Sequence, residues 1–412
     1  MNIEAALARV QAKLGVIPQD AADEITNKCD VALLDEEEYI KQFHVTKHVL
    51  MCLIRTYSAL CEKDAGKYLH YGATTQEIVD TATMLQLKQA YEIIEQKLRE
   101  LRKITAEKAK QYRSLVCMGR TNGQHAMPIT LGYRIASWVD ELDRSIERMR
   151  QAKKRIFVGS FFGAVGTLAS LKDSGLEIQK GLLQELGLGI PKMSWYSSRD
   201  RLAEMINIFC VLMGTLGRIG NEVYVSSMSE IGEMTEEFTE GKVGSSTMPH
   251  KRNPVIAYGI VSNARLSRSI AIDGLSIMEN VDERDGRPLS MECEPLTKIC
   301  LITDATMDAT ISLVSGLEIH KKNIERNLYL MGGLVFSETI MMRLSKTLGK
   351  TEAHEKVYEI AQKAISEEGN FCDLLTMDPV VSAIIRKEEL KELINPQHYI
   401  GLSEYFVDCV AN

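Results

Sequence analysis

The stretch from Gly241 to Pro254, GKVGSSTMPHKRNP, carries several groups that could do chemistry and has no apolar periodicity. It combines glycines with three consecutive hydroxyls, three possible cations and an asparagine. Three more stretches, 70–76, 119–130 and 159–167, also interrupt the helical pattern with polar side chains. Helix N-termini favour anions, and loops on a rigid scaffold commonly carry binding groups. Together the four stretches predict a site for a substrate with more than one carboxylate, with Thr74, Thr75, Thr121, Asn122, Lys251 and Asn253 as candidate donors.

Taken singly, each stretch has an ordinary structural explanation. A Thr-Thr pair before a helix is usually a cap, and a lone His70 is more often a structural hydrogen-bond donor than a catalyst. His44 and His48 are four residues apart, as in some metal sites. No HExxH motif or third ligand accompanies them, so capping or packing is the favoured interpretation.

Helices must position these stretches. Apolar residues recur at helical spacing, and strand signals are nearly absent, with no Asn-Gly or Asp-Gly turn joining two alternating runs. We therefore expect an all-α fold. The three long central helices, of about 25–35 residues each, would be about 40–50 Å long and would pack against the same helices of other subunits. The predicted helices cover about 1–15, 80–112, 130–155, 199–233, 255–278 and 296–318, with several shorter ones in 326–412.

Composition limits the possible partners and the location. The 412 residues suffice for two or three domains, and the net charge of −7 without a basic block makes nucleic acid an unfavourable partner. Nine cysteines without CxxC spacing indicate reduced thiols, hence a cytoplasmic protein. No apolar run approaches a membrane span, and residues 1–20 do not resemble a signal peptide. No cofactor is expected, since neither a dinucleotide fingerprint nor a metal cluster occurs.

Three segments carry a resemblance to a known family: HYGATTQEIVDTA (70–82), GRTNGQHAMPITLG (119–132) and GSSTMPHKRNP (244–254). They resemble, in order, the signature segments of the fumarase/aspartase superfamily, and the resemblance covers nearly the whole chain. Within that superfamily the chain is most similar to the branch of adenylosuccinate lyases and 3-carboxy-cis,cis-muconate cycloisomerases. The similarity to this branch lies in MPHKRNP, SSRDRLAE (197–204), NVDERDG (280–286) and NPQHYIGLSEYFVD (395–408).

The resemblance implies a homotetramer in which each active site is built from three chains. Each chain would have an N-terminal helical domain (1–80), a central long-helix domain with the signature loop (81–325) and a C-terminal helical domain (326–412). The central domain would join a shared helical bundle. This agrees with the expectation that the long helices need partners.

The family reaction is an anti β-elimination that releases fumarate. A base removes a proton beside a carboxylate, the carbanion is held as an aci-carboxylate, and a C–N or C–O bond breaks. Because that proton is very weakly acidic, fixed donors must stabilise a doubly charged carboxylate. The resemblance makes Ser245 the base and gives a carboxylate to Lys251 and Asn253. It places Ser246 and Met248 beside the substrate, with Met248 shaping the loop.

The segment 70–76 supplies further contacts by the same resemblance. His70 matches a histidine that contacts the substrate near its leaving group, and Thr74 and Thr75 match carboxylate binders, with Gln76 beside them. His48 aligns loosely with another histidine of the branch.

Position 122 departs from the family pattern. Typical members read Thr-His where this chain reads Thr121-Asn122, and that histidine is the general acid or part of its relay. Asparagine cannot deliver a proton near neutral pH. Three consequences stay open: His125 or His70 is the acid, an amine leaves without strong acid help, or the reaction is a cycloisomerisation. Thr121, Asn122 and Gln124 are then candidate substrate contacts.

The nucleotide end of an adenylosuccinate lyase site is also altered. The resemblance expects an Arg-Tyr pair upstream of the first residues and an arginine in the phosphate-binding segment, which here reads PLSME (288–292). Arg199, Arg201, Arg284 and Arg287 could compensate, and we take Arg201 and Arg284 as candidate substrate contacts.

Three hypotheses follow. The first is a lyase that cleaves the C–N bond of an N-succinyl compound, similar to adenylosuccinate lyase. The second is an enzyme similar to 3-carboxy-cis,cis-muconate cycloisomerase. The third is a non-catalytic structural tetramer, against which the retained Ser245 and Lys251 argue. We favour the first, with a di- or tricarboxylate as the substrate.

Overall fold

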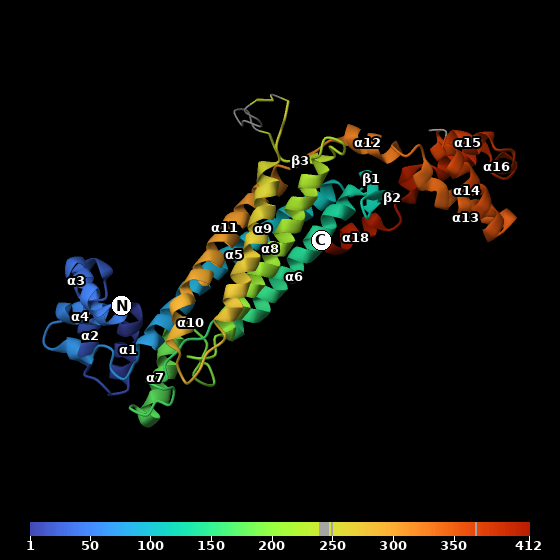
Figure 1. The fold of residues 1–412 in the computed structure, drawn as a ribbon. Coiled ribbons are helices and arrows are strands. Elements are labelled where there is room, and N and C mark those ends of the chain that lie inside the picture. The colour runs from blue at the N-terminus through green and yellow to red at the C-terminus, as the bar shows by residue number, and fades with distance from the viewer. Residues whose placement is uncertain (239–246, 249, 367–368) are drawn as a thin grey trace. The chain divides into compact units, whose positions relative to one another are not determined.

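The chain forms two compact units, each built from segments distant in sequence. The computed structural model describes residues 1–412 except 239–246, 249 and 367–368. Unit 1 comprises Met1–Gln96, Glu147–Val211 and Leu266–Asp304. Unit 2 comprises Lys97–Ile146, Leu212–Arg265 and Ala305–Asn412. The predicted all-α class is confirmed, because helices make up most of the described chain (Figure 1). The three-domain division stays a prediction.

Unit 1 holds the N-terminal helices and one part of each long helix. Its short helices are α1 (Asn2–Lys13), α2 (Gln19–Asn27), α3 (Glu36–Thr46), α4 (Val49–Leu60), α7 (Lys172–Glu185) and α10 (Gly286–Met291), with 3₁₀ turns η1 (Val31–Leu33) and η2 (Ala65–Tyr68). The long helices that enter it are α5 (Thr75–Gln111), α6 (Leu131–Ile156), α8 (Asp200–Ser226), α9 (Val255–Ser276) and α11 (Cys293–Ser315).

Unit 2 holds the other parts of these long helices, the strands and the C-terminal helices. The strands are β1 (Val116–Thr121), β2 (Gln124–Thr130), β3 (Met234–Thr235) and β4 (Glu318–Ile319). The C-terminal helices are α12 (Lys321–Tyr329), α13 (Ser337–Leu348), α14 (Lys350–Ser366), α15 (Phe371–Met377), α16 (Pro379–Ile384), α17 (Lys387–Leu393) and α18 (Ser403–Ala411), with 3₁₀ turns η3 (Leu334–Phe336) and η4 (Pro396–Tyr399).

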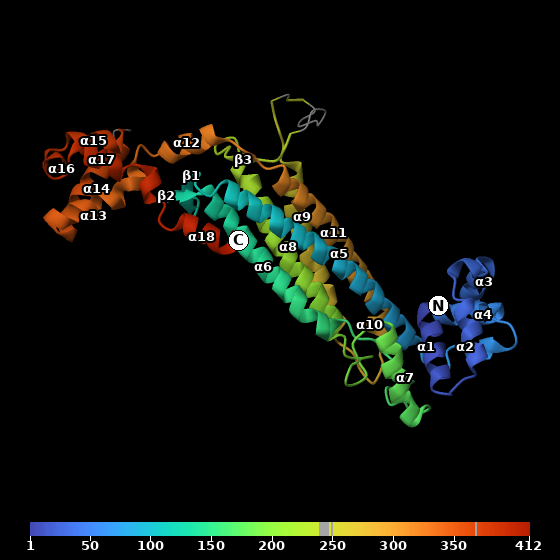
Figure 2. The same cartoon turned by 180° about the vertical axis from the view of Figure 1, so that it is seen from behind.

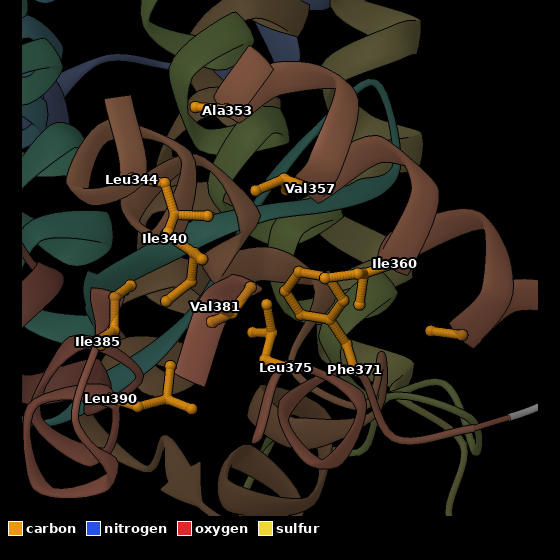
Figure 3. Close-up of a cluster of buried hydrophobic side chains, with 11 residues drawn as sticks. Ile340, Leu344, Ala353, Val357, Ile360, Phe371, Leu375, Val381, Ile385 and Leu390 are labelled. Carbon is orange, nitrogen blue, oxygen red and sulfur yellow. The ribbon is translucent and has the colours of Figure 1, made fainter. Parts of the chain in front are cut away.

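Apolar stripes at helical spacing pack the helices within each unit. In unit 1 the ring of Tyr91 on α5 stacks on Phe209 of α8, with 5.3 Å between ring centroids, and meets the edge of Phe157 at 5.1 Å. Segments of the long helices lie side by side in both views (Figures 1 and 2). In unit 2, Ile340, Phe371 and other buried side chains of α13–α17 form a separate core (Figure 3).

Helix α8 is long and apolar enough to cross a membrane by length and composition, which the sequence analysis did not anticipate. Of its most apolar window, 56% is buried inside the protein. Core helices of water-soluble proteins can also be this long and apolar. The buried share of α8 indicates that it is such a core helix.

A β-hairpin interrupts the helices, and the expectation that no Asn-Gly turn joins two strands is therefore wrong. Strands β1 and β2 pair antiparallel, with Thr121 opposite Gln124. The two residues between them, Asn122 and Gly123, have φ of 51° and 79°. Two positive φ values are the requirement of a type I′ turn, for which Asn-Gly is the preferred sequence. The hairpin escaped prediction because the first four residues of β1 are all buried, so it lacks the alternation of a half-exposed strand.

Candidate active site

The predicted site residues fall into two groups, one in each unit. His70, Thr74, Thr75, Gln76, Arg201 and Arg284 belong to unit 1, and Thr121, Asn122, Gln124, His125, Met248, Lys251 and Asn253 belong to unit 2. Ser245 and Ser246 lie outside the described residues.

Thr74 immediately precedes α5 and faces a cation. Its backbone N–H donates to Glu77 Oε2 at 2.9 Å, which is the backbone half of a capping box. Its hydroxyl accepts a hydrogen bond from Arg284 Nη1 at 3.0 Å. A helix N-terminus, a hydroxyl and a guanidinium therefore meet at one point, the combination that suits a carboxylate.

Arg284 is held beside this turn by two further contacts. Its Nη2 donates to the carbonyl of Ala164 at 2.7 Å, and its guanidinium lies 5.8 Å from the ring centroid of Tyr196. The side chain is nevertheless exposed, so its remaining donors face solvent. The structure thus brings Thr74 and Arg284 together from positions 210 residues apart.

Glu77 fixes the glycine-rich stretch 159–167 to the start of α5. This buried carboxylate accepts hydrogen bonds from the backbone N–H groups of Phe162 and Gly163, the latter at 2.8 Å, and from the hydroxyl of Tyr196 at 2.6 Å. Burial and the adjacent charge of Glu77 raise the pKa of Tyr196 far above its usual range, so Tyr196 stays a neutral donor. The stretch 159–167 is therefore a support of the Thr74 turn.

His48 lies at the same turn. In the sequence, only a loose alignment with a histidine of the family branch pointed to His48 as a site residue. Its Nδ1 accepts the backbone N–H of Met51 at 3.1 Å, so it caps α4, as the favoured interpretation predicted. The same bond puts the ring proton on Nε2, which lies 3.5 Å from Thr75 Oγ1. His48 is thus oriented as a donor toward the turn.

A buried charge cluster near this turn occupies Arg199, which the sequence offered only as one arginine that could compensate at the nucleotide end. Arg199 donates two hydrogen bonds to Asp80 of α5, at 2.9 and 3.0 Å, and two to Glu292 after α10, at 2.5 and 2.9 Å. Burial raises the pKa of both carboxyls. The charge and hydrogen bonds of Arg199 act in the opposite direction and offset part of this rise. The cluster ties the segment of Arg284 to the first turns of α5.

Two further candidates of unit 1, Gln76 and Arg201, have internal partners. The amide Nε2 of buried Gln76 donates to the carbonyl of Tyr196 at 3.1 Å, while its Oε1 has no hydrogen-bond partner in the part of the chain that the structure describes. Arg201 donates through Nη1 to the carbonyl of Arg155 in the last turn of α6. Its described contact therefore caps a helix.

In unit 2 the hairpin carries Thr121, Asn122, Gln124 and His125. His125 pairs with Arg120 across the strands, and its buried Nδ1 has no hydrogen-bond partner among the described residues. Burial, with the charge of Arg120, lowers the pKa of His125, which favours the neutral imidazole. A neutral ring is a weak general acid at neutral pH, so this environment does not favour His125 in that role.

Buried Glu233 ties this hairpin to the end of α8. It accepts hydrogen bonds from Arg120 at 2.6 and 3.1 Å, from Arg134 at 3.2 Å and from the amide of Asn327 at 2.9 Å. Burial acts to raise the pKa of Glu233, but these donors and charges outweigh it and lower the pKa.

Described residues before the signature stretch 241–254 contact described residues at and just after its end. The carboxylate of Glu236 accepts the backbone N–H groups of Val255, Ile256 and Ala257 at 2.9–3.2 Å. The guanidinium of Arg252 lies 4.3 Å from the ring centroid of Phe238. The first amides of α9 are thus satisfied by a protein carboxylate, and Lys251 and Asn253 directly precede them.

Comparison with known proteins gives the family. Residues 1–264 match the family model described as Lyase, and residues 333–410 match that of the adenylosuccinate lyase C-terminus. The chain is 42% identical to an adenylosuccinate lyase of Methanocaldococcus jannaschii over 99% of this chain and 89% of the relative. It is 39% identical to an N-acetyl-S-(2-succino)cysteine lyase of Dickeya dadantii over 99% of this chain and 90% of the relative.

Comparison with solved structures supports the same family. The 3-carboxy-cis,cis-muconate lactonizing enzyme from Pseudomonas putida superposes with a TM-score of 0.93 at 30% identity, covering 100% of this chain and 92% of that one. The fold and these matches together show that the chain is a lyase of the fumarase/aspartase superfamily. Within it, the chain belongs to the branch of adenylosuccinate lyases and 3-carboxy-cis,cis-muconate cycloisomerases, which confirms the resemblance seen in the sequence.

Proposed function

We propose that this lyase eliminates fumarate from an N-succinyl compound by C–N cleavage, as an adenylosuccinate lyase does. The observation that carries the proposal is the meeting of Arg284 with Thr74 at the start of α5, beside His48. This arrangement offers a cation, hydroxyls and a histidine to a carboxylate and its leaving group. The 42% identity to an adenylosuccinate lyase supports the choice of bond.

The roles follow from the chemistry of each group. Ser245 removes the proton beside the carboxylate, while Lys251 and Asn253 hold the doubly charged carboxylate that forms. Thr74, Thr75 and Arg284 bind the other carboxylate. His48, with its proton on Nε2, or His70 gives a proton to the leaving atom. With either histidine as the proton donor, the reaction needs no histidine at position 122.

We propose that each active site combines the site residues of unit 1 from one chain with the site residues of unit 2 from another chain. We propose that the protein is a cytoplasmic homotetramer whose long helices pack against those of other chains. Exposed apolar side chains on these helices, among them Leu266, Ile272 and Leu301, support such packing, because association removes their surface from water.

A second candidate is the same elimination from a succinyl thioether, with C–S cleavage. The segment 288–292, which the resemblance gives to a nucleotide phosphate, makes internal bonds here: Glu292 binds buried Arg199, and the Ser290 hydroxyl donates to the carbonyl of Gly286 at 2.8 Å. A leaving group without phosphate suits this arrangement. A relative of 39% identity is named for a succinylated cysteine.

A substrate panel tests the proposal. Purified protein is given adenylosuccinate, argininosuccinate, aspartate, other N-succinyl amines, S-(2-succino) thioethers and 3-carboxymuconate. Fumarate release and the loss of the diene absorbance are followed. Fumarate from an N-succinyl compound supports the first candidate, and fumarate from the thioether alone supports the second. Loss of carboxymuconate without fumarate contradicts both and indicates a cycloisomerase.

Ser245→Ala tests the base. We expect turnover to fall by at least about 10³-fold, because the variant lacks the proposed base, while size-exclusion behaviour stays that of the wild type. Full activity in this variant would contradict the assignment of Ser245.

A further inference from the structure

A carboxylate at the start of the chain holds one of the site histidines. Glu4 of α1 is fully buried, and its Oε1 lies 2.8 Å from His70 Nδ1. Its Oε2 accepts the backbone N–H of His70 at 3.0 Å. Both oxygens of one carboxylate therefore bind one residue, 66 positions away in the sequence.

The backbone of His70 needs such a restraint. Its φ of 59° lies in the left-handed region, which a residue with a Cβ rarely adopts. The same helix α1 also holds the next residue, because Gln11 Nε2 donates to the carbonyl of Tyr71 at 2.7 Å. Helix α1 thus fixes the turn that leads into Thr74 through two polar side chains with separate tasks.

The bond to Glu4 decides which ring nitrogen of His70 is available. An ionised carboxylate only accepts, so the neutral ring carries its proton on Nδ1 and leaves Nε2 as an acceptor. His48 has the opposite arrangement, since its Nδ1 accepts from Met51 and its proton is on Nε2. His48 and His70 therefore present complementary atoms.

We propose that Glu4 is a positioning residue that holds His70 as the Nδ1–H tautomer, so that Nε2 is the atom that exchanges a proton with the substrate. This inference rests on the proposed function. In the elimination, protonated His70 gives its Nε2 proton to the leaving atom, which keeps the electron pair of the broken bond. The ring returns to the neutral Nδ1–H form without releasing Glu4, as carboxylate-oriented histidines do.

Glu4→Gln is the test, because glutamine keeps the size and can still accept the backbone N–H of His70. Unlike glutamate, its amide can also donate to Nδ1, which frees the ring to carry its proton on Nε2. With ¹⁵N-labelled histidine, we expect the His70 signals to leave the Nδ1–H pattern. We expect kcat to fall about 10–100-fold with KM changed less than about threefold, since the carboxylate contacts stay in place.

Gln11→Leu is the matched control. It removes the other hydrogen bond from α1 to the same turn and leaves the partner of His70 Nδ1 in place. We expect the His70 ¹⁵N pattern to stay that of the wild type and kcat to fall less than about threefold. A fall in kcat in both variants with unchanged ¹⁵N patterns would show that Glu4 is only a structural tether, and would overturn the proposal.

The two proposals can fail separately. If the wild-type protein releases no fumarate from any compound, the proposed function fails, and the ¹⁵N pattern of His70 in Glu4→Gln still decides whether Glu4 sets the tautomer. If the wild type is active and Glu4→Gln retains both its kcat and the Nδ1–H pattern, the inference about Glu4 is wrong while the function stands.

Discussion

At the scale of single residues, Asn122 has two explanations that differ in what they require of its side chain. As a turn residue it must adopt a φ of 51°, which asparagine does more readily than most residues other than glycine. As a substrate contact it must offer its amide. The hairpin gives asparagine a structural reason at a position where typical family members place a histidine.

A pair of variants separates these explanations. Asn122→Gly keeps the turn and loses the amide, whereas Asn122→Ala loses both. We expect Asn122→Ala to lower the free energy of unfolding by about 1 kcal/mol relative to Asn122→Gly, as measured in urea. If the amide binds substrate, KM rises in both variants. An unchanged KM in Asn122→Gly leaves Asn122 only its place in the turn.

At the scale of elements, apolar periodicity was enough to predict the long helices, because each buries one stripe against its neighbours. It predicted α8 to about residue 233, yet α8 ends at Ser226, whose carbonyl accepts the N–H of Glu233 after a turn with Gly232 at φ 59°. The sequence did not predict the hairpin, because a buried strand such as β1 does not alternate apolar with polar residues. The Thr74–Arg284 contact could not be predicted from periodicity, which carries no information on pairs 210 residues apart.

The tie between the hairpin and α8 should depend on pH. Because the folded-state pKa of Glu233 is lowered, its stabilising contribution is present above the unfolded pKa and is lost as pH falls through the folded value. We expect Glu233→Gln to lower the free energy of unfolding by about 3 kcal/mol at pH 7 and by less in acid. Thermal unfolding at pH 7 and at about pH 3, well below the ordinary carboxyl pKa, measures this difference.

Glu147→Gln is the control for this prediction, because Glu147 pairs with Arg150 on the surface of α6. We expect it to leave stability nearly unchanged at both pH values. An equal loss in Glu233→Gln at the two pH values would contradict the titration of the buried carboxylate as the cause.

At the scale of the whole molecule, the proposed chemistry uses residues from both units. His70 belongs to unit 1, and the described Lys251 and Asn253 of the signature stretch belong to unit 2. If sites are completed between chains, a defect in one chain can be compensated by another chain with a different defect.

Mixed oligomers test this. A His70 variant and Ser245→Ala, each inactive alone, are unfolded and refolded together in equal amounts. If each site takes His70 and Ser245 from different chains, random assortment makes about a quarter of the sites wild type at both positions, and about a quarter of the wild-type activity returns. Absence of any recovery in mixed oligomers, verified by mass spectrometry, would place both residues in one chain.

The anchored flanks of the signature stretch have a consequence for how the stretch tolerates changes in length. Glu236 and Phe238 on one side contact Val255 and Arg252 on the other, so described residues hold the two flanks together. Adding residues between two points that stay in contact costs little free energy, because loop closure costs little more for a longer loop. A longer stretch should therefore leave the stability of the helices beside it nearly unchanged, while it moves the base and the carboxylate contacts that the proposed function assigns to the stretch.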